Sequence, residues 1–110
     1  NNSGATPIKI DNHNVSSHHL LVARLDVQVT VEEFELIFSG MRAENILVNH
    51  HYIPIYKHPF YQHENNDSNY PEAEKYFMNA LSLPLFPNIR KEQIEQTTDA
   101  LKKVIEKCLR

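Results

Sequence analysis

Histidines are the residues of this sequence most able to do chemistry, with seven among 110 residues. Two neighbouring pairs, His18-His19 and His50-His51, suggest a metal site, because imidazole nitrogens are common zinc ligands. Adjacent residues of a strand point to opposite faces, so neither pair can chelate one ion by itself. One histidine of each pair could still meet across a sheet beside a carboxylate. Ordinary polar strand positions are the simpler interpretation, so we predict no metal site and keep a zinc-binding domain as a third hypothesis.

The other reactive side chains do not form a catalytic set. The single cysteine, Cys108, falls in the last turn of an expected helix, where the helix dipole disfavours a nucleophilic thiolate. Acidic pairs at Glu32-Glu33 and Glu72-Glu74 stand at helix starts, where they complement the dipole. We therefore predict no catalytic residue in this chain.

An aromatic cluster follows the second histidine pair. Its four rings surround two prolines: Tyr52, Tyr56, Phe60 and Tyr61. A strand that runs into an aromatic, hydrogen-bonding loop is typical of the wall of a ligand cleft. The same rings could instead fill the edge of the core, and composition favours neither interpretation.

The elements that would position these side chains follow from apolar spacing. Residues 17–26 carry a short apolar run, which predicts a buried strand. Thr30 and Glu33 can form a capping box, and a helix is expected there because the next apolar residues fall at helical spacing: Val31, Phe34, Ile37, Phe38 and Met41. Asn45 suits the left-handed turn that would end this helix.

The middle of the chain alternates between extended segments and helices. Residues 46–52 predict a second strand, which Pro54 ends or confines to a sheet edge. After a polar turn at 63–69, Pro71 suits the first turn of a short helix with one apolar face: Ala73, Phe77, Ala80 and Leu81. Residues 81–87 contain two prolines and permit only a short edge strand or an extended packing segment.

An amphipathic helix is expected at the end of the chain. Asn88 is its predicted N-cap, and its apolar face repeats near 3.6 residues: Ile94, Thr98, Leu101, Ile105 and Cys108. Residues 1–16 show no period and read as an extended lead-in or interdomain linker, which leaves 17–110 as one domain. This order predicts an α+β fold, a small antiparallel or mixed sheet with helices on one face and the other face open.

Composition excludes several function classes. The net charge of −3 provides no sequence-wide basic field for nucleic acid, and no apolar run reaches the ~20 residues that a membrane helix needs. Two glycines in the whole chain exclude a G-x-G-x-x-G loop and a P-loop. We expect a soluble, cytoplasmic domain that binds neither nucleic acid nor membrane, and a lone cysteine suits that reducing compartment.

The strongest signal lies in four segments, which occur in the order SSHHLLVARLD, HHYIPIYKHPFYQ, YPEAEKYF and ALSLPLFP. Their most specific pieces are His51-Tyr52-x-Pro54 and the run from Ala80 to Pro87. Together they span nearly the whole chain from Ser16 onward. They resemble the C-terminal part of the pyridoxal-phosphate-dependent sugar aminotransferases, the family of DegT, DnrJ, EryC1 and StrS. The stretch IPIYKHPFYQ is most similar to enzymes that aminate a 4-keto nucleotide sugar on the route to pseudaminic acid.

The resemblance implies a fold-type-I aminotransferase, a homodimer at full length, whose larger N-terminal domain holds pyridoxal phosphate on a Schiff-base lysine. That domain would be missing here, and neither Lys57 nor Lys75 matches the catalytic position. The implied reaction passes an amino group from glutamate to the cofactor and then to the keto carbon of a nucleotide sugar, in cell-surface polysaccharide or glycan biosynthesis. Residues 17–110 would be the small domain, inactive alone and without cofactor, and would supply one wall of the site.

The resemblance also assigns residues to that wall. His51 and Tyr52 match the family's His-Tyr pair near the active-site mouth, and residues 56–61 match the loop beside the substrate. The predicted substrate-binding residues are therefore His51, Tyr52, Tyr56 and Tyr61, with His51 as a donor to a sugar or phosphate oxygen. A second group is expected to pack and anchor the last helix: Leu83, Leu85 and Phe86. The alternative function is a free-standing module that binds a nucleotide sugar or a protein partner through residues 51–61.

Overall fold

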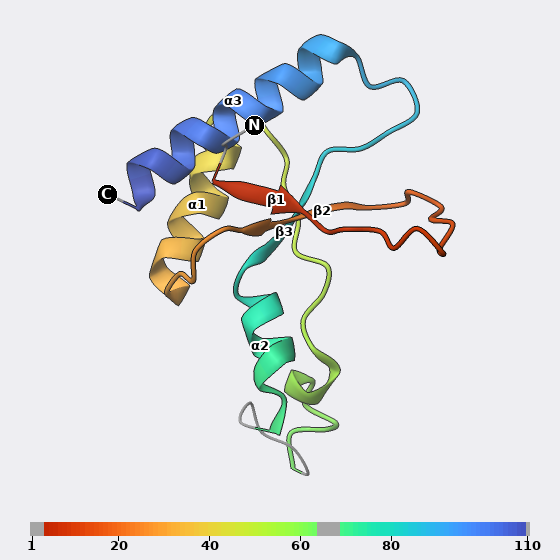
Figure 1. Cartoon of the computed structure of the whole chain (residues 1–110). Helices are drawn as coiled ribbons and strands as arrows, with labels where there is room; N and C mark the ends of the chain where they lie inside the picture. Colours follow the sequence, from red (N-terminus) through yellow and green to blue (C-terminus); the bar gives the residue numbers. More distant parts are fainter. Residues whose placement is uncertain (1–3, 64–68, 110) are drawn as a thin grey trace.

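The computed structural model describes residues 4–63 and 69–109 (Figure 1). Within them the strands are β1 (Ala5–Pro7), β2 (Leu21–Leu25) and β3 (Ala80–Leu83), and the helices are α1 (Val31–Ala43), the 3₁₀ helix η1 (Ile55–Lys57), α2 (Pro71–Phe77) and α3 (Lys91–Cys108). The predicted polar turn at 63–69 falls largely outside the described residues. The α+β fold expected from the sequence is confirmed.

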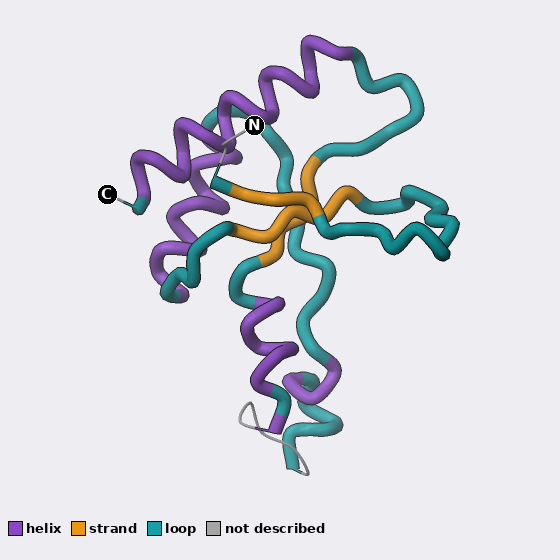
Figure 2. The backbone as a smooth tube through the Cα atoms, viewed as in Figure 1, coloured by secondary structure: helices purple, strands orange, loops and turns teal. Residues whose placement is uncertain are grey.

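One antiparallel sheet in the order β1-β2-β3 forms the centre of the described chain (Figure 2). The register sets Ala5 opposite Leu25, Ala23 opposite Leu81, and Val22 opposite Ser82. Since side chains alternate along a strand, Ala23 and Leu81 share one face while Val22 and Ser82 share the other. Helices α1 and α3 lie together on one side of the sheet, whereas α2 and η1 extend away from them (Figure 1).

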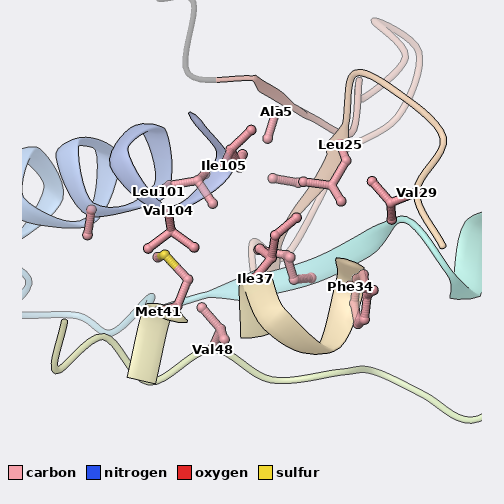
Figure 3. Close-up of a cluster of buried hydrophobic side chains, with 13 residues drawn as sticks. Ala5, Leu25, Val29, Phe34, Ile37, Met41, Val48, Leu101, Val104 and Ile105 are labelled. Atoms are coloured by element: carbon pink, nitrogen blue, oxygen red, sulfur yellow. The ribbon is translucent and has the colours of Figure 1, made fainter. Parts of the chain in front are cut away.

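The core lies between the sheet and the α1–α3 pair (Figure 3). Ile37, Met41 and Leu81 are its largest fully buried side chains. Helix α1 approaches α3 closely at Gly40, where a Cβ atom would lie 2.8 Å from Val104 Cγ1. A larger residue at this position would therefore push the two helices apart.

Both ends of α1 are as predicted. The Thr30 amide donates to Glu33 Oε2 at 2.8 Å, and the Glu33 amide donates to Thr30 Oγ1 at 3.2 Å, which completes the capping box. Asn45 has a φ of 60°, and the Ile46 amide behind it donates to the Met41 carbonyl. These local hydrogen bonds fix both ends of the helix.

The extended segments differ from prediction. The strand expected at 46–52 is wrong, because this segment meets the edge of β3 only at the bridge between Asn49 and Ser82 and then turns away. Ala80 and Leu81 belong to β3 and not to the short helix, which ends at a C-cap on Met78. The Nδ2 of the buried Asn79 side chain donates to the carbonyls of Leu25 and Val27 and so holds the start of β3 beside β2.

Two further expectations concern the chain termini. Part of the predicted lead-in at residues 1–16 forms β1, and Ala5 is buried in the core. The domain boundary between residues 16 and 17 stays a prediction. Helix α3 begins after Arg90 and not after Asn88, and the Arg90 amide donates to Gln93 Oε1 at 2.9 Å. Its buried face is also shifted from the predicted one, since Ile94 is 49% exposed and the buried residues are Thr97, Ala100, Leu101, Val104 and Ile105.

Candidate functional site

The candidate site is the segment of residues 51–61, which we name the lip. It begins two residues after Asn49, which pairs with Ser82 at the edge of β3. It then passes through η1 and runs beside α2, away from α1 and α3 (Figure 1). Helix α2 has no buried residue, so this arm of the molecule stands outside the core. The lip is therefore positioned by specific contacts at its start and at its middle.

His51 anchors the start of the lip. Its Nδ1 lies 2.8 Å from Ser82 Oγ, across a sequence separation of 31 residues. Ser82 is buried on the sheet face away from α1 and α3, the same face as its register partner Val22. The Tyr52 ring meets the His51 ring edge-on at 4.6 Å and is 69% exposed. The predicted His-Tyr pair thus lies together on the open side of the sheet.

Tyr56 and Glu74 anchor the middle of the lip. The Tyr56 hydroxyl donates to Glu74 Oε1 at 2.6 Å, and the Lys57 ammonium lies 3.0 Å from the same oxygen. The Tyr56 ring stacks on Tyr70 at 4.5 Å and is buried, while the Lys57 ammonium lies 5.7 Å above the Phe77 ring. Glu74 from α2 therefore joins two consecutive lip residues.

The aromatic cluster combines the two arrangements considered from the sequence, because one ring packs inward and the other three are exposed. Tyr56 is buried, at 7% exposure, and packs at the inner side of the lip. Tyr52 and Phe60 face solvent, and Tyr61 meets Phe60 edge-on at 5.0 Å. Of the four predicted site residues, Tyr52 and Tyr61 are exposed, His51 is half-buried, and Tyr56 turns inward to Glu74.

His50 holds the base of the lip. Its ring stacks on Phe77 at 4.3 Å, lies 5.1 Å from the Phe34 ring, and its Nε2 lies 2.6 Å from the Phe77 carbonyl oxygen. Burial lowers the pKa of His50 below its ordinary value of 6.5, the Phe77 carbonyl acts in the opposite direction, and the charge of His51 lowers it further. The neutral ring therefore links α1, the lip and α2.

Acid should weaken this junction. Well above pH 6.5 the ring is neutral in both states, and as the pH falls toward and through 6.5 the unfolded chain takes up the proton first. The free energy of unfolding should therefore decrease between pH 7.5 and about 5.5. Urea denaturation of the wild type and His50→Gln measures this, and the variant should lose part of the decrease while the exposed control His19→Gln keeps it. An unchanged pH dependence in His50→Gln would contradict the assignment.

Two residues of this arrangement were not indicated by the sequence, Ser82 and Glu74. Ser82 lies inside the segment that was expected only to pack, and Glu74 was assigned to the helix dipole. No short-range spacing connects them with the lip, because the contacts span 31 and 18 residues. The packing expectation holds for Leu83 but is wrong for Leu85 and Phe86, which are 41% and 45% exposed.

The open face beyond Ser82 is apolar. Val22 lines a hollow of about 390 Å³. The other apolar residues that line it come from the segments after β1 and after β3 and from around the start of β2: Ile8, Ile10, Leu20, Leu21 and Leu85. The exposure of Leu85 follows from this position, since it faces the hollow and not the core. The sequence had indicated an uncovered sheet face, and the structure shows it.

The histidine pairs do not converge on a metal ion. Within residues 4–63 and 69–109 there is no group of three histidine, cysteine or acidic side chains that could hold one. His50 and His51 have the ring contacts to Phe77 and Ser82, and His18 is an exposed residue with a φ of 51°. The idea that one histidine of each pair meets across the sheet is therefore not supported by the described geometry.

Four of the described lysines have carboxylate partners. Lys57, Lys75 and Lys103 lie 2.7–3.0 Å from carboxylate oxygens, and Lys91 lies 3.7 Å from one. Every helix within residues 4–63 and 69–109 is too short or too polar to span a bilayer.

Known proteins resemble the chain in sequence and in fold. Residues 1–102 match the model of the DegT/DnrJ/EryC1/StrS aminotransferase family. The spore coat polysaccharide biosynthesis protein SpsC of Bacillus subtilis is 29% identical over 90 residues, which are 79% of this chain and 23% of that protein. The chain thus spans about a quarter of the length of this relative.

Solved structures agree with this match. The putative sugar aminotransferase Spr1654 of Streptococcus pneumoniae, in its PMP form, superposes with a TM-score of 0.85 at 29% identity, covering 96% of this chain and 27% of that one. PseC of Helicobacter pylori, an aminotransferase involved in the biosynthesis of pseudoaminic acid, gives a TM-score of 0.70 at 27% identity over 84% of this chain and 24% of that one. With a family match over nearly its whole length and this fold, the chain belongs to the DegT/DnrJ/EryC1/StrS aminotransferase family.

Proposed function

We propose that this chain is the C-terminal small domain of a pyridoxal-phosphate-dependent sugar aminotransferase and forms one wall of its nucleotide-sugar site. The observation that carries the proposal is the lip, which presents Tyr52 at 69% exposure beside the anchored His51 on the open side of the sheet. An exposed ring next to a fixed polar group is suited to holding a ligand and poorly suited to packing a core.

Each lip residue has a separate role in this proposal. His51 donates to a sugar or diphosphate oxygen, and Tyr52 contributes a stacking face or a hydroxyl contact. Tyr61 extends the contact surface at the far end, where its exposed ring lies against Phe60. Tyr56 supports the site from inside, because its hydroxyl is held by Glu74.

The rest of the reaction belongs to the N-terminal domain in this proposal. That domain would hold pyridoxal phosphate, which carries the amino group from glutamate to the keto sugar. The length of the relatives supports this division, since Spr1654 in its PLP form is covered over only 28% of its chain. The apolar hollow at Val22 provides a surface for further protein, and the full-length enzyme would be a cytoplasmic homodimer of polysaccharide or glycan biosynthesis.

A nucleotide-sugar titration tests the wall. With ¹⁵N-labelled chain and uridine diphosphate N-acetylglucosamine at millimolar concentration, we expect amide shift changes confined to residues 51–61. Tyr52→Ala should weaken the apparent affinity about two- to tenfold, as expected for the loss of one aromatic contact. Phe86→Ala is the matched control, because Phe86 is a 45% exposed ring outside the lip. The absence of shift changes at millimolar ligand would contradict the proposal.

A further inference from the structure

We infer that Ser82 is the positioning residue of the sugar-binding wall: its hydroxyl donates to Nδ1 of His51 and so presents the His51 ring as a hydrogen-bond donor at Nε2. The nucleotide-sugar ligand in this inference rests on the proposed function, whereas the hydrogen bond between Ser82 and His51 is independent of it. It also gives a role to the Ser-Leu-Pro-Leu segment, which the sequence indicated only as packing.

The contact between the two segments is fixed by the backbone. The Ser82 amide donates to the Asn49 carbonyl at 2.8 Å, and the Asn49 amide donates to the Ser82 carbonyl at 3.0 Å. This closed pair holds Asn49 opposite Ser82 and so keeps His51, two residues on, within reach of Ser82. His51 Nδ1 lies 2.8 Å from Ser82 Oγ.

Burial decides the direction of the hydrogen bond. Ser82 is 5% exposed, and His51 Nδ1 is the hydrogen-bond partner found for its hydroxyl among the described residues. If Nδ1 carried the proton, the buried hydroxyl hydrogen would have no acceptor there, which costs more than an unused oxygen lone pair. The favoured arrangement has the hydroxyl donating and Nδ1 accepting.

This direction determines what His51 can bind. A neutral ring that accepts at Nδ1 carries its proton at Nε2, so it offers a single N–H to a ligand. That donor suits an oxygen acceptor such as a diphosphate, a sugar hydroxyl or a keto oxygen, and it does not suit proton abstraction. The Tyr52 ring at 4.6 Å forms the side of the same position. The wall would therefore orient a nucleotide sugar without acting as a base.

Histidine ring ¹⁵N spectroscopy tests the hydrogen bond without any ligand. At a pH where imidazoles are neutral, the His51 ring of the wild type should show its proton at Nε2 and a hydrogen-bonded acceptor at Nδ1. Ser82→Ala should move the Nδ1 resonance to the position of an unbonded nitrogen, Ser82→Thr should restore it, and the control Ser39→Ala should leave it unchanged. A wild-type ring protonated at Nδ1, or an Nδ1 resonance unaffected by Ser82→Ala, would overturn the inference.

A second arm separates this inference from the proposed function. Uridine diphosphate N-acetylglucosamine should bind Ser82→Ala about two- to tenfold more weakly than the wild type, and Ser82→Thr should recover the affinity. If the ring signature is found but the wild type does not bind the nucleotide sugar, the hydrogen bond stands and the proposed function fails. Binding that is equal in Ser82→Ala and the wild type would overturn the positioning role.

Discussion

Replacing Ile37 by alanine should lower the free energy of unfolding by about 2–5 kcal/mol. Ile37 has no exposed surface and points from α1 into the cluster shared with β2 and α3 (Figure 3). The truncation removes buried methyl groups and leaves a cavity that the sheet cannot fill. Small domains are stable by about 5–15 kcal/mol, so the loss should be a large part of the total. Urea denaturation followed by circular dichroism measures it.

Ile94→Ala is the matched control for this prediction. It removes the same atoms from a residue of α3 that is 49% exposed, and it should change the free energy of unfolding by less than about 1 kcal/mol. Equal losses in the two variants would show that α3 buries the face predicted from the sequence and not the face of Thr97, Ala100 and Val104.

The error about the face of α3 has a physical origin. The predicted stripe ran through Ile94, Thr98, Leu101, Ile105 and Cys108, and of these Leu101 and Ile105 are buried. The helix turns its small residues Thr97 and Ala100 toward the core instead of Ile94. The predicted stripe left these two residues out, although small side chains permit a close approach between helices. Which residues of a helix are buried depends on where its partner crosses it.

The local signals at the ends of α1 were reliable, whereas the N-cap signal at Asn88 and the long-range strand prediction were not. The capping box at Thr30 and the left-handed turn at Asn45 depend on residues a few positions apart, and both were predicted. The strand at 46–52 was not formed, because a β-branched run makes a strand only where a partner edge is free over its length, and β3 offers it one bridge. Likewise β1 has only three residues, too few for any pattern.

The same division applies to the candidate site. The resemblance and the aromatic cluster located the lip, but composition could not say which ring turns inward. The choice of Tyr56 depends on Glu74 and Tyr70, which come from a different part of the chain. The contact of Ser82 could not be predicted from the sequence either, because it depends on the pairing of two segments that are far apart in the chain.

Replacing Glu74 by alanine should release the lip while the core stays folded. The substitution removes an oxygen that accepts from Tyr56 at 2.6 Å and pairs with Lys57 at 3.0 Å. Hydrogen bonds to charged groups contribute about 1.5–3 kcal/mol, and each 1.4 kcal/mol is a factor of about ten in an opening equilibrium. Amide exchange should therefore become about tenfold or more faster at the lip amides bonded within the lip itself: Lys57, His58 and Tyr61.

The control variant distinguishes the release of the lip from a general effect of charge. Glu72→Ala removes the same group from the same helix, but Glu72 is an exposed residue whose carboxylate pairs with Lys75 on the surface. Such pairs contribute little, so lip exchange should stay near the wild-type rate in this variant. Core amides of α1 should be unaffected in both proteins, because α2 buries no residue. Faster exchange throughout the chain in Glu74→Ala, or unchanged exchange in the lip, would show that the carboxylate does not hold the lip in place.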